Sequence, residues 1–165
     1  VPVSLNEFCK NRIRKLEESG KWLEEHMPSE KAYAEGYITI EGAENILNKI
    51  RNLLSQVDQR VYISCTRNYL LLLVRELDEL MEARKKVVIL TDQPASFRNA
   101  KVYLGENRGM QIGIIADSKY VLTGEYGEGS MNTCLYSGQK NFVELYKTAL
   151  ANEIKLLSIR EENRY

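Results

Sequence analysis

The feature that most constrains the fold of this chain is an alternation of β-branched runs with amphipathic segments in its first half. The runs at 36–40, 60–66 and 86–92 are rich in Val, Ile and Tyr and predict strands. Between them, 43–57 and 69–83 carry apolar residues at helical spacing. Two strand–helix–strand crossovers in succession predict a parallel sheet with right-handed connections.

The second half of the chain is richer in strand patterns. A tight turn is expected at 117–119, and the apolar spacing over 140–157 predicts a closing helix. The polar tail at 160–165 is expected to fray. Four runs predict further strands: 101–104, 110–116, 120–123 and 131–136. We therefore expect an α/β fold in which helices flank a mixed sheet.

The N-terminal segment follows a different pattern. Ser4-Leu5-Asn6-Glu7 has the form of a capping box, and Pro28 ends the run of helix-favouring residues. We expect residues 1–30 to form a coiled-coil dimerisation helix ahead of a domain at 31–165; an amphipathic helix packed on its own domain is the alternative. The apolar residues alternate by four and three positions, as in a coiled-coil seam: Cys9, Ile13, Leu16, Gly20, Leu23 and Met27.

Composition excludes several classes of partner. The 23 Lys and Arg residues balance 23 Asp and Glu, so the chain has no bulk attraction to a polyanion. No apolar stretch approaches the roughly 18 residues that span a bilayer, so we expect no membrane partner. The three cysteines are widely spaced and odd in number, which favours reduced, buried thiols in a cytoplasmic protein over a disulfide framework or a zinc site.

Two stretches together resemble a known regulatory domain: YITIEGAENILNKIRNLLSQVDQRVYISCT, and the helix and KVVILTD run that follow it. They resemble the effector domain of the TrmB family of transcriptional regulators over about residues 36–157. The resemblance implies a phospholipase-D-like fold. It also implies that the N-terminal helix connects to a winged-helix DNA-binding domain outside these 165 residues.

The phospholipase D superfamily is marked by H-x-K-x-x-x-x-D, six residues and then G-S. Over this frame the sequence has Met110 at the His, Ile112 at the Lys, Asp117 at the Asp and Gly124-Glu125 at the Gly-Ser. In the active enzymes that the resemblance implies, the His is the nucleophile and the Lys stabilises charge on the phosphate. The thioether of Met110 and the aliphatic side chain of Ile112 can do neither. Because the lone histidine, His26, lies on the N-terminal helix, we predict no enzyme, no catalytic residue, no metal and no cofactor.

A ligand crevice in an open α/β sheet lies at the carboxyl ends of its parallel strands. Hydroxyls, amides, carboxylates and an aromatic face at those ends suit a neutral polyhydroxyl ligand such as a sugar. The alternative is that these residues bind no ligand, because polar residues collect at strand ends in any α/β protein. For Asp117 the alternative is a structural role in a turn, in which its carboxylate accepts a hydrogen bond from the backbone N–H of Ser118 or Lys119. The candidate ligand-binding residues are Ser64, Thr66, Asn68, Asp92, Asp117, Glu125, Tyr126 and Asn132.

The leading hypothesis is therefore a regulatory domain. It would bind a small effector, such as a sugar, and relay occupancy through a homodimer helix to a DNA-binding domain outside this chain. The alternatives are a divergent phosphodiesterase or nuclease of the phospholipase D superfamily, or a pure dimerisation module.

Overall fold

The computed structural model describes residue 14 and residues 36–107 and 109–163. The chain divides into two units, Val1–Tyr33 and Ala34–Tyr165, and all described residues except residue 14 belong to the second. The coiled-coil seam falls outside the described residues and stays a prediction for Cys9, Ile13, Leu16, Leu23 and Met27.

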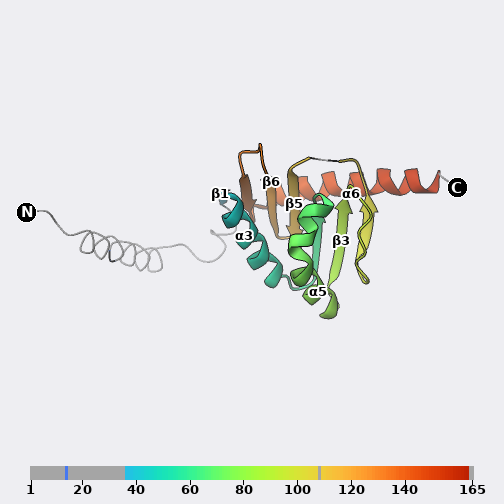
Figure 1. The fold of residues 1–165 in the computed structure, drawn as a ribbon, viewed down its shortest axis with the longest axis horizontal. Coiled ribbons are helices and arrows are strands. Elements are labelled where there is room, and N and C mark those ends of the chain that lie inside the picture. Colours follow the sequence, from blue (N-terminus) through green and yellow to red (C-terminus); the bar gives the residue numbers. More distant parts are fainter. Residues whose placement is uncertain (1–13, 15–35, 108, 164–165) are drawn as a thin grey trace, which may run out of the picture. The chain divides into compact units, whose positions relative to one another are not determined.

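The described residues of the second unit form a seven-stranded mixed sheet (Figure 1). The order across the sheet is β1-β7-β6-β5-β2-β3-β4. β2 runs parallel to β3 and β3 to β4, and all other neighbours are antiparallel. The strands are β1 (Tyr37–Glu41), β2 (Arg60–Ser64), β3 (Lys86–Thr91), β4 (Lys101–Leu104), β5 (Gln111–Ala116), β6 (Tyr120–Glu125) and β7 (Thr133–Ser137).

The predicted parallel crossover is confirmed for β2 and β3 but is wrong for β1 and β2. β1 lies at the far edge of the sheet and pairs antiparallel with β7, with Thr39 opposite Leu135. The periodicity of a segment indicates a strand or a helix, but it does not specify which strand lies next to which. That choice is made by long-range packing.

Several helical segments cover one face of the sheet, and one long helix covers the other (Figure 1). The first face carries α3 (Ala43–Ser55), α4 (Arg67–Leu70), the 3₁₀ turn η1 (Leu71–Leu73) and α5 (Val74–Glu82); the second carries α6 (Lys140–Glu162). α6 continues past the predicted end at 157 and includes part of the tail that was expected to fray, so that boundary is corrected.

The helix predicted over 69–83 is interrupted by η1. Leu70, Leu73 and Leu77 are all fully buried, while Leu71 and Leu72 between them are exposed. A continuous α-helix was expected because the apolar residues on both sides of η1 have helical spacing. The tighter turn keeps the buried leucines directed at the sheet and leaves two leucines facing out.

Two hydrophobic cores lie on opposite sides of the sheet, and β2 contributes to both. Val61, Ile63 and Cys65 pack in the core beneath α3 and α5, whereas Tyr62 packs against the core beneath α6. This is the alternation expected of a strand that is covered on both faces. Ser64 and Cys65 therefore point to opposite sides of the sheet.

Among the described residues, none of the helices combines the length and the apolar character that a bilayer span requires.

Candidate functional site

The ends of several neighbouring strands lie together along one edge of the sheet, the edge that runs across the strands. β2 and β3 finish there, β5 starts there, and β6 finishes beside β5, with Gln111 opposite Glu125 (Figure 1). This is the upper edge in Figure 1. Ligands of open α/β sheets collect at such an edge because loops, rather than further strands, cover it.

A pocket of about 310 Å³ opens at this edge, on the side of the sheet that carries α4 and η1. We call it the aromatic pocket. No side chain that lines it among the described residues carries a charge. Its lining residues are Cys65, Thr66, Asn68, Tyr69, Leu72, Gly109, Met110, Gln111, Ile112, Tyr126 and Gly127.

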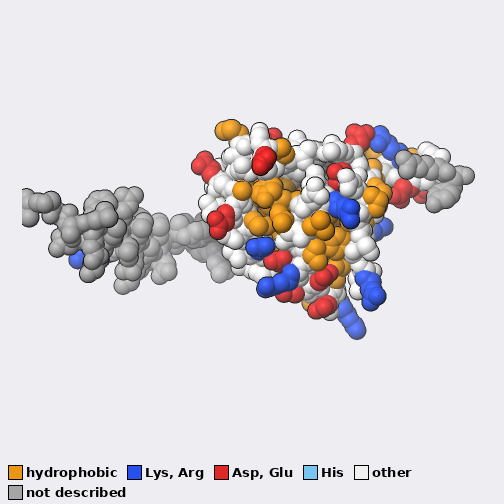
Figure 2. All heavy atoms as spheres, viewed as in Figure 1, with side chains coloured by type: hydrophobic (Ala, Val, Ile, Leu, Met, Phe, Trp, Pro, Cys, Tyr) orange, Lys and Arg blue, Asp and Glu red, His pale blue; other side chains and the backbone are white. Residues whose placement is uncertain are grey.

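Hydrophobic side chains also gather on the surface of this face (Figure 2). Leu72 and Met110, which line the aromatic pocket, are 42% and 43% exposed. The pocket therefore has an apolar surround, and its polar groups come from Thr66, Asn68 and Gln111.

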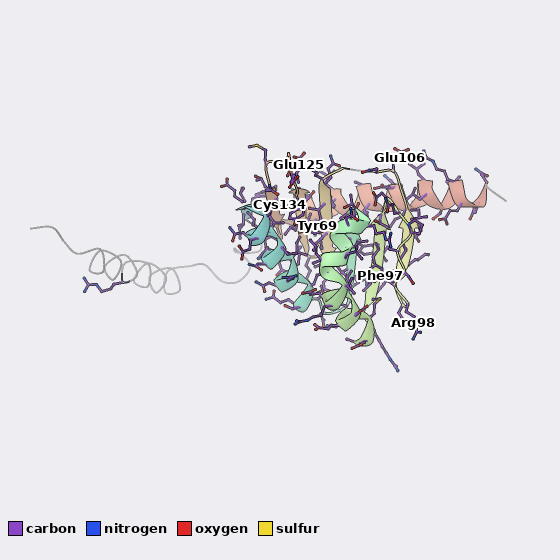
Figure 3. The ribbon with its side chains drawn as sticks, viewed as in Figure 1. Tyr69, Phe97, Arg98, Glu106, Glu125 and Cys134 are labelled. Atoms are coloured by element: carbon purple, nitrogen blue, oxygen red, sulfur yellow. The ribbon has the colours of Figure 1, made fainter. Side chains whose placement is uncertain are left out.

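Tyr69, which is labelled in Figure 3, belongs to α4 and lines the aromatic pocket. Its ring meets the ring of Tyr126 edge to face, with centroids 4.3 Å apart. Tyr69 is only 5% exposed, and its hydroxyl has no hydrogen-bond partner. Leaving a buried hydroxyl unpaired costs about 1–3 kcal/mol, so this group is unlike the rest of the core.

The ionisation of Tyr69 is suppressed by its surroundings. Burial raises the pKa of Tyr69, and the neighbouring Tyr126, Cys134 and Cys65 raise it further, whereas Arg51 acts in the opposite direction. The side chain is therefore a neutral phenol at physiological pH. It can donate one hydrogen bond and accept others from a bound molecule.

Two cysteines lie near this tyrosine and are buried, as the sequence predicted for them. Burial raises the pKa of Cys65 to about 12, with a further contribution from Asp92, and burial raises the pKa of Cys134 to about 11. Both side chains are therefore thiols at neutral pH rather than nucleophilic thiolates.

The structure separates the eight predicted ligand-binding residues. Thr66, Asn68 and Tyr126 line the aromatic pocket together. Ser64 and Glu125 line a different cavity, which is described below. The eight residues therefore do not line one shared cavity: Glu125 and Tyr126 are neighbours at the end of β6 that line different cavities, and Thr66 lies beyond the end of β2, where the chain enters α4.

Asp92 and Asn132 support the edge from outside the aromatic pocket. Asp92 accepts the backbone N–H of Arg67 at 3.0 Å and so holds the first residue of α4. Asn132 has a φ of 47° and accepts the N–H of Gly127 at 2.9 Å through its side-chain oxygen. These residues shape the loops that present Thr66 and Tyr126, and neither lines the aromatic pocket.

Asp117 lies at the opposite edge of the sheet and is a correction to the predicted site. Its carboxylate accepts the backbone N–H groups of Asp58, Gln59 and Arg60, at the start of β2. The alternative prediction of a turn carboxylate is right in kind, but the partners come from another segment rather than from Ser118 or Lys119.

Two other positions of the phospholipase D frame, Met110 and Ile112, line the aromatic pocket, whereas Gly124 and Glu125 line the other cavity. Met110 lines the aromatic pocket, and its thioether lies against Gly127. Ile112 is 3% exposed and belongs to the core beneath α3 and α5. Within the described residues, no cluster of three or more His, Cys, Asp or Glu side chains could hold a metal ion.

Sequence reasoning did not select Tyr69, Leu72 or Gln111 as site residues. Only polar residues at strand ends were considered, whereas Tyr69 and Leu72 belong to helical turns after β2. Tyr69 directly follows the candidate Asn68, so a search of the first helical turn after the strand could have included it.

Comparison with known proteins finds no matching family model and no matching curated protein. Solved structures do match. NucT from Helicobacter pylori is 15% identical, with 73% of this chain and 97% of NucT covered and a TM-score of 0.55. Nuc from Salmonella typhimurium, a phospholipase D family member, is 10% identical, with 73% and 94% covered and a TM-score of 0.53.

TrmBL2, an archaeal chromatin protein, is similar over a longer stretch of this chain. It is 13% identical and has a TM-score of 0.55, with 92% of this chain covered. The match spans 63% of the length of TrmBL2.

The prediction that this chain is not an enzyme is contradicted by these neighbours and is wrong. It rested on the missing His and Lys at positions 110 and 112, but the fold is shared with a phospholipase D family member over nearly all of that protein. The predicted fold class, in contrast, is confirmed: the described domain has a phospholipase-D-like fold.

Proposed function

We propose that this domain senses a small uncharged effector, such as a sugar, and binds it in the aromatic pocket. The observation that carries the proposal is Tyr69, which lines that pocket and whose buried hydroxyl has no hydrogen-bond partner. The hydroxyl oxygen is covered in the ligand-free protein, so a ligand hydroxyl would pair with it once the side chains around it shift, and would then recover the free energy that the unpaired group costs.

The remaining lining fits the two sides of a sugar ring. The rings of Tyr69 and Tyr126 offer apolar surface to its C–H groups, while Thr66, Asn68 and Gln111 offer hydrogen bonds to its hydroxyls. The hydroxyl of Thr66 makes no capping hydrogen bond to α4, so it is available. The lack of charge on the described lining favours an uncharged ligand over an ionic one.

The test is titration of the full chain with neutral monosaccharides and disaccharides, followed by thermal unfolding and isothermal titration calorimetry. A ligand that binds should raise the melting temperature. Tyr69→Phe and Asn68→Ala should each weaken binding about fivefold or more, as expected for the loss of one hydrogen bond. Tyr62→Phe, on the other face of the sheet, is the matched control. Binding that survives both pocket variants unchanged, or no binding by any sugar, contradicts the proposal.

We further propose that effector binding is relayed through an N-terminal dimer helix to a DNA-binding domain. The likeness to TrmBL2 and the heptad spacing of residues 9–27 support this relay. The effector must bind one dimer arrangement more tightly than another for occupancy to be transmitted. Light scattering should give a dimer for the full chain and a monomer for the double variant Leu16→Glu/Leu23→Glu; a monomeric wild-type chain would rule the relay out.

A phospholipase-D-type phosphodiesterase is the second candidate. The likeness to Nuc over 94% of that chain favours it. The purified chain should then hydrolyse bis(p-nitrophenyl) phosphate, and Gln111→Ala should reduce the rate while Tyr62→Phe leaves it unchanged. Asp117→Ala is unsuitable here, because its carboxylate supports the start of β2. No hydrolysis, or hydrolysis that is unaffected by Gln111→Ala, contradicts this candidate.

A further inference from the structure

A second cavity, of about 270 Å³, lies at the same edge of the sheet but beneath α6. We propose that it is a separate binding site for a neutral compound with vicinal hydroxyl groups. We call it the hydroxyl cavity. The residues that carry the argument are Ser64, Gln111, Gly113, Thr123, Glu125 and Tyr146.

The two cavities lie on opposite faces of the sheet. Ser64 points away from Ile63 and Cys65, which pack beneath α3 and α5, and toward the side of Tyr62, which packs beneath α6. On β6, Val121 belongs to the core beneath α6, and Thr123 follows it two residues later on the same face. Gln111 and Ile112 line both cavities, whereas Ser64, Thr123, Glu125 and Tyr146 line the hydroxyl cavity and not the aromatic pocket.

Ser64 provides direct support for a ligand. It is 5% exposed, it lines the hydroxyl cavity, and its Oγ has no hydrogen-bond partner. A buried hydroxyl without a partner is uncommon in native structures, since it forfeits the hydrogen bonds it made to water. The oxygen is covered in the ligand-free protein, so a ligand hydroxyl in the cavity would restore one of them once the atoms over Ser64 shift.

Thr123 and Tyr146 add a pair of hydroxyl groups to the cavity. Thr123 Oγ1 and Tyr146 Oη lie 3.0 Å apart, and either can be the donor. Only one of the two hydrogens is used in that bond, so the other hydroxyl hydrogen remains available. The missing side chain of Gly113 leaves the space in which the Tyr146 hydroxyl lies. The pair is thus held in place and still able to bond a ligand.

Glu125, labelled in Figure 3 at the end of β6, and Gln111, its register partner at the start of β5, complete the lining. A carboxylate accepts two parallel hydrogen bonds, which a pair of adjacent hydroxyls can donate. The same negative charge disfavours an anionic compound. Three hydroxyls, one amide and one carboxylate therefore match a neutral polyol.

The test uses xylitol as the probe and the full chain as the protein, with binding followed by amide NMR. Xylitol should shift the amide signals of Gly113, Thr123 and Glu125, and diethylene glycol, which lacks vicinal hydroxyls, should not. Ser64→Ala and Glu125→Gln should each weaken xylitol binding about fivefold or more, the effect of one lost hydrogen bond. Tyr62→Phe, on the same face but outside the cavity, should bind as wild type does.

Tyr69→Phe separates this inference from the proposed function, because it alters only the aromatic pocket and should leave xylitol binding unchanged. The proposal is overturned if xylitol shifts no amide signals at the cavity, if diethylene glycol binds equally well, or if Ser64→Ala and Glu125→Gln both retain wild-type affinity. Signal dispersion in the same spectra verifies that each variant is folded.

Discussion

The carboxylate of Asp117 accepts the backbone N–H of Gln59 at 2.7 Å, and the amides of Asp58 and Arg60 donate to the same carboxylate at 2.8 and 3.0 Å. One side chain thus joins the β5–β6 turn to the first residues of β2. This contact supports the antiparallel register in which Val61 lies opposite Ala116. Residues of β5 line both cavities, Ser64 at the end of β2 lines the hydroxyl cavity, and Cys65 and Thr66, which follow β2, line the aromatic pocket, so the alignment of β2 with β5 affects each site.

Asp117→Ala should lower the free energy of unfolding by about 2–4 kcal/mol, because three backbone amides lose a charged acceptor. Asp117→Asn should cost less, since it keeps one acceptor oxygen and tolerates the φ of 53°. Urea unfolding measures both. Asp78→Ala, at an exposed position of α5, is the control. Equal effects of Asp117→Ala and Asp78→Ala would show that the contact contributes nothing.

The same contact should make the free energy of unfolding depend on pH in the acid range. Burial alone would raise the pKa of Asp117, but the amides of Asp58, Arg60 and Gln59, together with Lys119, lower it below the ordinary value of 3.8. A lowered pKa in the folded state stabilises the fold above the unfolded-state pKa, and this stability is lost as pH falls through the folded-state value. The stability difference between wild type and Asp117→Asn should therefore shrink below pH 3.8. A difference that stays constant with pH would contradict this assignment.

Gly113 and Tyr146 should show strong energetic coupling. A Cβ at position 113 would overlap the Tyr146 hydroxyl and lie 3.0 Å from its Cζ atom. Gly113→Ala should therefore cost about 2–3 kcal/mol of stability, whereas Tyr146→Phe alone should cost about 1 kcal/mol through the lost bond to Thr123. The double variant should be more stable than the sum of the two effects predicts, because the overlapping oxygen is gone. Additive effects in denaturant unfolding would mean that the ring moves aside freely.

Tyr69→Phe should stabilise the ligand-free protein by about 1 kcal/mol, because it removes a buried hydroxyl that has no partner. The same variant should weaken binding in the aromatic pocket. Urea unfolding without ligand, with Tyr62→Phe as the comparison, measures the first effect. A clear loss of stability would instead indicate that the hydroxyl is paired in the free protein.

Cys65 and Cys134 should resist alkylation in the folded state. Both are buried, and their pKa values of about 12 and about 11 leave almost no thiolate at neutral pH. Iodoacetamide at neutral pH should modify both residues only after urea is added, as read by peptide mass spectrometry. Rapid modification of Cys65 in native buffer would show that the aromatic pocket opens in solution. In the structure Tyr69, which also lines this pocket, is only 5% exposed.

Local sequence patterns were sufficient for most of the strands and helices. The runs at 60–66 and 86–92 predicted adjacent parallel strands, and the structure pairs Val61 with Val87. The isolated cysteines predicted buried thiols at 65 and 134. These features depend on local sequence, because the alternation or helical spacing within one segment indicates which face of that strand or helix is apolar.

Tertiary packing decided how the predicted residues were combined. In the folded chain β1 lies beside β7, and Ser64 and Thr66 line different cavities. Asp117 lies at the opposite ends of the strands, and Tyr69 lines a pocket that the sequence pattern at the strand ends did not predict. The sequence by itself determined the elements and their apolar faces. Only the three-dimensional structure decided which polar groups meet, because strand order and the sidedness of each strand depend on contacts between residues far apart in the chain.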